Sequence, residues 1–200
     1  TVLRSSYKTL SVSQVQSMAN VSIREKTDSG FLGHSTINHI YDLKSINGDK
    51  VVIDDATGLM WHQSGSVGYM NWNKAKEWVR SLNSRGYAGY HDWRLPTVDE
   101  AASLLESSEG NNEGELIVGK IVTGAGDLYI DPIFSNKQTY IWTGDDCHTA
   151  PEPQHGLEGA GGAWEVVFAR CLVKLNTFFY ITNELIFYGS GYVRPVRSVR

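Results

Sequence analysis

The stretch DWRLPTVDE, residues 92–100, contains the clearest local signal in the chain for the start of a helix. Thr97 and Glu100 have the spacing of a capping box, in which each side chain accepts a hydrogen bond from the other residue's backbone N–H. The residues that continue the pattern as an apolar stripe are Ala101, Leu104 and Leu105. The stretch therefore predicts a helix that begins after Thr97 and packs one face against a core.

Upstream of this stretch, residues 71–86 have the period of a second, amphipathic helix. Apolar residues recur there at steps of three and four positions, with Lys, Glu and Arg between them. The apolar positions are Trp72, Ala75, Trp78, Val79 and Leu82. Asn71 is a suitable N-cap and Gly86 a suitable C-terminal stop, so both ends of this helix are predicted.

Farther upstream the pattern changes to β-strands. The runs Ile40–Ile46 and Val51–Ile53 flank Asn47-Gly48, and Asn-Gly between β-prone runs is the preferred tight hairpin turn. A second turn at residues 55–58 leads into Leu59-Met60-Trp61. We expect a hairpin followed by a third strand.

Downstream of residue 128, short β-prone runs dominate the chain. They are Tyr129–Phe134, Thr139–Thr143, Trp164–Phe168, Leu172–Leu175, Phe178–Thr182, Leu185–Tyr188 and Tyr192–Val196. Two helices followed by a β-rich second half predict the α+β class.

The domain organisation follows from the same reading. Residues 1–37 carry too weak a pattern for more than an extended N-terminal arm, and residues 38–200 form one ligand-binding domain. Residues 106–127 are predicted to be an insertion containing a small hairpin, and residues 147–162 a long loop rich in Gly and Pro.

Composition excludes several classes of function. Eighteen Lys and Arg against 22 Asp and Glu give a net charge of −4, which argues against a nucleic-acid partner. No apolar run approaches the roughly 18 residues of a membrane-spanning helix. The chain has no serine-centred elbow, phosphate-binding glycine loop or HExxH motif, so no catalytic residue is predicted.

Six tryptophans and two arginines are predicted to have structural roles, in the core and in ion pairs. Six large apolar side chains in one small domain are more often core than a ligand platform. Arg94 and Arg197 could each hold a carboxylate in a bidentate pair, with Asp92 or Asp131 as the partner.

Several sequence blocks, taken in order, resemble a known family. They are Asp54-Asp55-Ala56-Thr57-Gly58-Leu59-Met60-Trp61, Asp92-Trp93-Arg94-Leu95-Pro96-Thr97, Asp131-Pro132-Ile133-Phe134, Tyr140-Ile141-Trp142-Thr143, Ala163-Trp164-x-Val166-x-Phe168 and Gly191-Tyr192-Val193-Arg194-Pro195-Val196-Arg197. The series resembles the DUF1566 family, the domain at the C-terminus of the Legionella collagen-like adhesin, over residues 40–198. The DWRLPT block is also similar to the RLPT segment of formylglycine-generating enzymes.

This resemblance implies a C-type lectin-like fold that displays irregular segments as a binding surface, on a protein at the cell surface or secreted. Some members of this branch are variable proteins of diversity-generating retroelements, in which a C-terminal segment is rewritten at adenine-containing codons. The implied frame is residues 163–168 and 191–197, with the variable segment between them. Family members usually have Gly where this chain has Cys171.

The ligand-binding residues implied are Arg170, Leu172, Lys174, Asn176, Phe178, Phe179, Tyr180, Thr182, Asn183, Phe187 and Tyr188. Phe and Tyr flanked by Asn and Arg would suit a protein or other macromolecular ligand. Alternating Phe179, Ile181 and Leu185 are equally typical of a buried strand, and composition does not separate the two.

The predicted function is thus a non-enzymatic ligand-binding module that displays a variable C-terminal binding surface, as a variable protein of a diversity-generating retroelement does, without a metal or cofactor. One alternative is an adhesin of fixed specificity that binds sulfated or host glycans through basic C-terminal residues. Another is a copper-dependent oxidase like the formylglycine-generating enzymes, which would need Cys147 or Cys171. A soft-metal set of Cys147, His148 and His155, or a calcium set of Asp145, Asp146 and Glu152, is a weaker signal.

Overall fold

The structure is a computed structural model that describes residues 1–107, 128–147, 159–181, 184–187 and 189–199. Helices α1 (Val12–Val15), α2 (Trp72–Arg85) and α3 (Val98–Ser103) accompany a short 3-10 helix, η1 (Tyr87–Gly89). The strands are β1 (Val21–Thr27), β2 (Gly30–Ser35), β3 (Tyr41–Ile46), β4 (Asp49–Asp54), β5 (Leu59–His62), β6 (Tyr140–Cys147), β7 (Gly159–Val167), β8 (Leu172–Ile181), β9 (Glu184–Phe187) and β10 (Val196–Ser198). The α+β class is confirmed.

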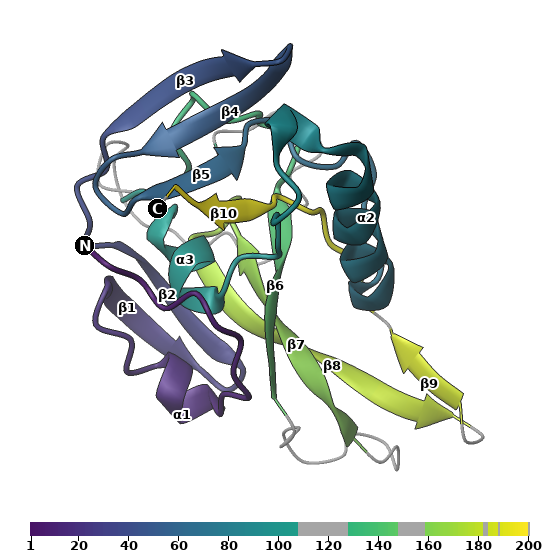
Figure 1. The fold of residues 1–200 in the computed structure, drawn as a ribbon. Helices are drawn as coiled ribbons and strands as arrows, with labels where there is room; N and C mark the ends of the chain where they lie inside the picture. The colour runs from purple at the N-terminus through teal and green to yellow at the C-terminus, as the bar shows by residue number, and fades with distance from the viewer. Residues whose placement is uncertain (108–127, 148–158, 182–183, 188, 200) are drawn as a thin grey trace.

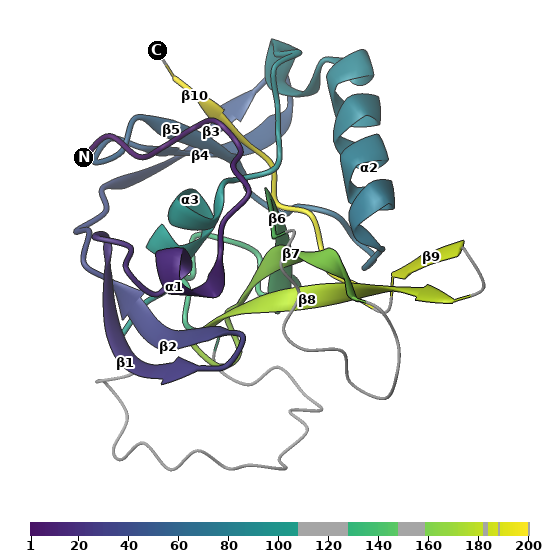
Figure 2. The same ribbon diagram turned by 90° about the horizontal axis from the view of Figure 1, so that it is seen from below.

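The strands form two antiparallel sheets (Figure 1). The larger has the order β1-β2-β8-β7-β6, with β9 paired to the far end of β8, and the smaller has the order β10-β5-β4-β3. Helix α3 lies between the sheets, whereas α2 packs on another side (Figures 1 and 2). The C-terminal strand β10 joins the smaller sheet beside β5, so the chain's second half closes onto its first.

Local sequence explains the β3–β4 hairpin and the two main helices. Asn47 and Gly48 have φ of 53° and 88°, the left-handed values that a tight hairpin turn needs. Helix α2 begins at the Asn71 cap and ends at Gly86, which has φ of 68°. In α3, Thr97 and Glu100 form both bonds of the capping box. The predicted hairpin and both helices are confirmed.

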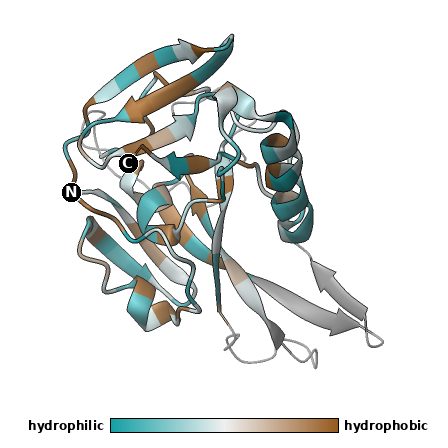
Figure 3. Cartoon of the chain, in the orientation of Figure 1, coloured by the Kyte–Doolittle hydropathy of each residue, from teal (hydrophilic) through white to brown (hydrophobic). Residues whose placement is uncertain are grey.

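Two apolar clusters hold these layers together. The first joins the inner face of the larger sheet to α3 and includes Phe31, Val166 and Val173. The second lies under the buried stripe of α2, whose opposite side is hydrophilic (Figure 3). The fully buried tryptophans are Trp61, Trp93, Trp142 and Trp164, while Trp72 and Trp78 are partly buried.

Arginine clamps close the frame, with one departure from the predicted pairing. Arg197 holds Asp92 as predicted, with its Nε 2.7 Å from the carboxylate. Arg94 instead makes two 2.6 Å bonds to Glu100, the capping-box residue six positions away. Arg194 is fully buried and donates to backbone carbonyls and to the Gln138 side chain, and burial lowers its pKa to about 9.

The strand boundaries correct several predictions. Residues 129–134 form no strand, because the Asp131 side chain accepts from the Ile133 N–H and turns the chain at Pro132, which has no N–H to give a ladder. The loop predicted for 147–162 is shorter, since β6 reaches Cys147 and β7 begins at Gly159. The runs at 172–175 and 178–182 are largely one strand, β8. Of the insertion predicted at 106–127, residues 108–127 lie outside the part of the chain that the structure describes.

The N-terminal segment is more than an extended arm. Strands β1 and β2 form a hairpin whose second strand pairs with β8, which extends the larger sheet. Before them, residues 1–10 run across the frame: Leu10 N–H donates to Asp146, and Arg4 pairs with Asp145 at 2.7 Å. Gly30 and Gly33 lie so close to neighbouring backbone that no Cβ fits, and such glycines weaken the β pattern from which strands are predicted.

Candidate functional site

A buried carboxylate lies on the face of the larger sheet that turns away from α3. Glu165 on β7 is only 1% exposed and stands directly between Trp142 on β6 and Lys174 on β8 in the strand register. The Lys174 ammonium lies 3.3 Å from its Oε2, and the Asn176 amide donates to the same oxygen at 3.1 Å. We call the side of β6–β8 that carries these residues the outer face.

The environment of Glu165 makes its charge costly. Burial raises the pKa of the Glu165 carboxyl above its ordinary value, while Lys174 and Asn176 offset part of that effect. Lys174 is itself 38% exposed, so the partner of the buried carboxylate is within reach of solvent or a ligand.

Tyr140 on β6 is close enough to Glu165 to interact with it electrostatically, and it is one end of a row of three tyrosine rings, Tyr140, Tyr192 and Tyr69, that we call the tyrosine ladder. The ring centroids of Tyr69 and Tyr192 are 6.1 Å apart, and those of Tyr192 and Tyr140 are 5.5 Å apart. Tyr69 is 64% exposed. Burial raises the pKa of Tyr140, whose hydroxyl also bonds to the Ser190 side chain. The ladder therefore runs from a half-buried polar end to an exposed ring.

Backbone pairing brings these distant residues together. Tyr192 and Tyr140 are linked by a 3.1 Å backbone bond, and Met70 and Gly191 bond to each other in both directions at 2.9 Å. Gly189 passes so close to Asn176 that a Cβ on it would lie 2.4 Å from the amide nitrogen. Residues 189–192 thus cross the outer face and leave room for the polar group only because Gly189 has no side chain.

The structure brings together only part of the predicted ligand-binding set. Lys174 and Asn176 both reach Glu165, whereas Arg170 lies exposed in the turn before β8 and Leu172 is partly buried at its start.

For the rest of that set, the structure gives only backbone positions or nothing. Phe178, Phe179 and Tyr180 belong to β8 and Phe187 to β9, with Phe178 opposite Phe187 and Phe179 opposite Ile186. Thr182, Asn183 and Tyr188 lie outside the described residues. Display of the aromatic run at the surface therefore stays a prediction.

Sequence reasoning missed Tyr69, Tyr140, Glu165, Ser190 and Tyr192. Three of them stand within motif blocks that were assigned to the frame. Glu165 gave a usable signal, because a carboxylate between Trp164 and Val166 in a strand must point to the opposite face from those apolar neighbours. Tyr69 gave none, since its position depends on long-range pairing.

A hollow of about 440 Å³ beside His39 contains several titratable groups. The His39 ring places Nδ1 2.7 Å from the buried Asp54 carboxylate and Nε2 2.6 Å from the Ser103 carbonyl. Burial alone would raise the pKa of Asp54, but bonds from His39 and Thr57 outweigh it and lower the pKa. Both ring nitrogens are occupied, so His39 cross-links the frame and has no nitrogen left for a substrate.

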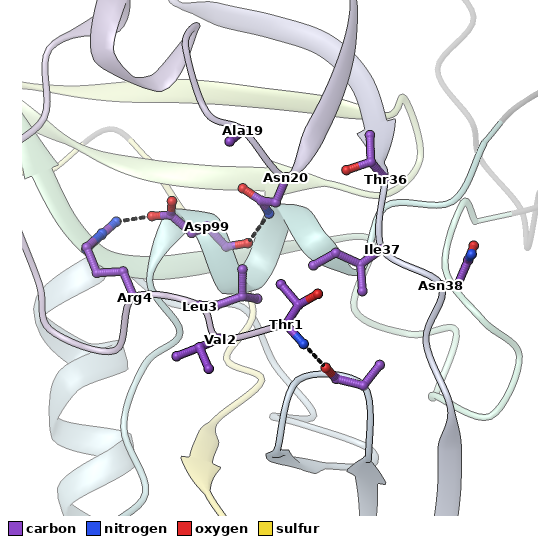
Figure 4. A pocket seen from close by; sticks show the side chains of 11 residues that line it. Thr1, Val2, Leu3, Arg4, Ala19, Asn20, Thr36, Ile37, Asn38 and Asp99 are labelled. Atoms are coloured by element: carbon purple, nitrogen blue, oxygen red, sulfur yellow. Dashed lines mark hydrogen bonds and ion pairs between the residues drawn. The ribbon is translucent and has the colours of Figure 1, made fainter.

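A second groove, of about 770 Å³, lies between residues 1–4, α3 and the connection at 36–38 (Figure 4). Two interactions with Asp99 fix one wall of this groove. Arg4 forms an ion pair with the Asp99 carboxylate, and the Asn20 amide donates a 2.9 Å hydrogen bond to the Asp99 backbone carbonyl. Among the described residues that line it, no buried side-chain polar atom lacks a partner. We therefore do not assign a ligand to this groove.

The cysteines and acids considered for metals occupy other places. In the strand register, Cys147 is opposite Gly162, and Leu172, which directly follows Cys171, is opposite Val167. Gly162 and Val167 are about 17 Å apart along β7, so the two cysteines are too far apart for a disulfide. The Asp145 carboxylate forms an ion pair with Arg4 and accepts a 2.6 Å hydrogen bond from the Val98 N–H. Within the described ranges, no three His, Cys, Asp or Glu side chains gather in a metal-binding arrangement. His148, Glu152 and His155 lie outside those ranges.

The backbone at Cys171 explains the glycine that the resemblance leads one to expect there. Its φ is 49°, a left-handed value that glycine adopts without the cost imposed by a Cβ. Burial also raises the pKa of the Cys171 thiol to about 11, which disfavours the reactive thiolate.

Comparison with known protein families gives a match over most of the chain. The family model described as the Lcl C-terminal domain matches residues 50–197. No curated protein and no solved structure matches the chain. Among the described helices, none has both the length and the apolar character needed to cross a bilayer.

Proposed function

Because this chain belongs to the Lcl C-terminal domain family, we propose that it is a non-enzymatic, adhesin-like domain that binds a macromolecular ligand on the outer face of β6–β8. The observation that carries this proposal is the tyrosine ladder beside the Glu165–Lys174–Asn176 group. Exposed aromatic rings next to a few convergent polar groups are typical of recognition surfaces.

The chemistry of the remaining polar groups supports a binding role. His39 has both nitrogens engaged, and Cys171 is a buried thiol with a raised pKa. A formylglycine-type oxidase would need an accessible, reactive cysteine, which this setting disfavours. The groups on the outer face suit hydrogen bonding to a ligand.

The outer face favours fixed specificity. Lys174 and Asn176 are the partners of a buried carboxylate, so changing either would remove one of the two hydrogen-bond donors to Glu165. Such positions are poor targets for repeated rewriting. An adhesin of fixed specificity therefore accounts for these two residues better than a diversified surface does.

The test is a binding array of immobilised oligosaccharides and proteins, probed with the labelled chain. Tyr69→Ala should lower binding to the recognised spots at least tenfold, because it removes the most exposed ring of the ladder. Leu43→Ala is the matched control, since Leu43 is 45% exposed on β3 at the far side of the molecule (Figure 1). Equal binding by all three proteins would contradict the proposal.

The second candidate is a variable protein of a diversity-generating retroelement. It is favoured by the β8–β9 hairpin, which projects from the body and is held by backbone pairing that does not depend on side-chain identity (Figure 1). Deep sequencing of the coding region across a growing population would detect it as substitutions confined to adenine-derived codons at 178–188. A segment as constant as residues 92–97 would eliminate it.

A further inference from the structure

We infer that His39 forms a proton-controlled latch, which holds the connection between the two sheets only while both of its ring nitrogens carry protons. The His39 latch consists of the imidazole ring, the Asp54 carboxylate and the Ser103 backbone carbonyl. It is a regulatory device of the fold and does not depend on ligand binding at the outer face.

His39 lies in the connection between β2 of the larger sheet and β3 of the smaller sheet. Its Nδ1 is 2.7 Å from the Asp54 carboxylate at the end of β4, and its Nε2 is 2.6 Å from the carbonyl of Ser103, the last residue of α3. The His39 side chain is 10% exposed and that of Asp54 is 1% exposed, so solvent screens this pair little. One side chain therefore joins the connection to both a strand and a helix.

The two partners of the ring determine how many protons it must carry. A backbone carbonyl oxygen only accepts hydrogen bonds, so Nε2 needs a proton to bond to Ser103. Asp54 also accepts from the Thr57 hydroxyl and the Ala56 N–H, as an ionised carboxylate does. Such a carboxylate has no proton to donate, so Nδ1 needs one as well. The two bonds therefore require the positively charged ring, and the loss of either proton brings two lone pairs face to face.

The surrounding charges favour the same state of the ring. Tyr41 stacks on His39 with the ring centroids 5.0 Å apart. The charged groups that act on this pair of rings are Asp54, Glu106, Asp131 and Arg194. Burial, and then the Asp131 charge, raises the pKa of Glu106, whereas the charge of His39 lowers it. Without a charge on His39, three carboxylates would face a single cation, so deprotonation would add repulsion to the loss of a hydrogen bond.

The opposite requirement applies to His62, which shows that the latch is not a general property of the histidines in this fold. The His62 Nδ1 accepts a 2.9 Å bond from the Gly65 N–H and so needs a nitrogen without a proton. The His39 latch needs protons on both nitrogens, and unfolding frees them. Its contribution to stability is therefore present below about pH 6.5, the ordinary range of histidine, and is lost as the pH rises.

The experiment observes the ring and the backbone around it in the whole chain, at about pH 6 and about pH 9. In nitrogen-15 spectra of the imidazole, we expect both His39 nitrogens to be protonated at the lower pH and one to be deprotonated at the higher pH. The bonded amides of Ile40, Ala56 and Leu105 should then exchange at least about tenfold faster at the higher pH, after correction for the intrinsic pH dependence. The amides of α2 should show no such change, which separates local opening from global unfolding.

Two variants complete the test. In His39→Gln, whose side chain does not titrate, the same amides should exchange fast and at equal corrected rates at both pH values. His34→Gln alters another partly buried histidine, on β2, and should keep the tenfold difference. A His39 ring with only one proton at the lower pH, or equal corrected rates in the unchanged chain, would overturn the latch. The ring spectra of the unchanged chain decide this even where a variant does not fold.

Discussion

Two buried carboxylates, Glu100 in the frame and Glu165 on the outer face, are held in different ways. Glu100 is 0% exposed and accepts two 2.6 Å bonds from Arg94 and a 2.8 Å bond from the Thr97 N–H. Glu165 is almost as buried but accepts only longer bonds, at 3.1 and 3.3 Å, from side chains that are themselves partly exposed.

The difference separates a structural from a binding role. Short bonds from a bidentate arginine and from the backbone use three of the roughly four acceptor sites of the Glu100 carboxylate, and they connect the helix start to the rest of the fold. The donors to Glu165 belong to side chains that are partly exposed. The bonds of Glu100 are thus used within the fold, whereas in our proposal the partly exposed donors to Glu165 also bond to a ligand.

The largest expected effect tests the structural side. Glu100→Ala removes the partner of Arg94 and one half of the capping box, so we expect a loss of about 3–5 kcal/mol in the free energy of unfolding. Urea denaturation measures it. A loss below about 1 kcal/mol would show that the Arg94–Glu100 pair does not hold the frame.

Acid should destabilise the frame through His62. Burial, and then Arg194, lowers the pKa of this histidine from 6.5 to about 4, and its Nδ1 accepts from the Gly65 N–H, which requires the neutral ring. Because the folded pKa lies below the unfolded one, this stability is present above pH 6.5 and is lost as the pH falls toward 4. At about 1.4 kcal/mol per pH unit, the loss is about 3 kcal/mol.

The matched variant for this loss is His62→Asn, whose amide oxygen can replace Nδ1 as an acceptor. Denaturation midpoints between pH 7 and pH 4 should fall less in the variant than in the unchanged chain. Parallel pH curves would refute the role of His62.

The same substitution at the two cysteines should have unequal effects. Cys147 is buried in β6, where glycine removes packing and weakens the strand, so Cys147→Gly should cost about 2–3 kcal/mol. At Cys171 the relief of a left-handed φ offsets the lost packing, so Cys171→Gly should stay within about 1 kcal/mol of the unchanged chain. Thermal melts compare the two. Equal losses would contradict the strain assigned to Cys171.

The smallest expected effect tests the binding side. Glu165→Gln keeps an acceptor for Lys174 and Asn176 without the buried charge, so stability at pH 7 should change by less than about 1 kcal/mol. Since the folded pKa of Glu165 is raised above its ordinary 4.5, its contribution is present at low pH and is lost as the pH rises. The unchanged chain should therefore lose stability relative to Glu165→Gln as the pH rises above 4.5. A difference that runs in the opposite direction would contradict the burial cost.

Sequence predicted the parts of the fold that depend on near neighbours. The Thr97–Glu100 capping box, the Asn47-Gly48 turn and the Gly86 stop each lie within a few residues, and all three form as expected. Family resemblance added the order of the blocks. The partner of Arg94 was predicted wrongly because the choice between nearby carboxylates depends on the helix start that positions Glu100.

The candidate site was predicted only in part, because its residues come from distant segments. Lys174 and Asn176 lie on one strand and were found from the sequence. Tyr69 joins them only because the Met70–Gly191 pairing brings its loop to residues 189–192, which cross the outer face. No local periodicity encodes such a pairing, so the ladder became visible only in three dimensions.

The most direct test of the account is to map the bound ligand by amide chemical-shift perturbation, using the tightest-binding soluble oligosaccharide or protein fragment from the array. We expect the largest shifts at Tyr69, Lys174, Ser190 and Tyr192, with the amides around His39 and those of residues 1–4 unmoved. Shifts centred on His39 or on the N-terminal groove, with the outer face unchanged, would contradict the assignment of ligand binding to that face.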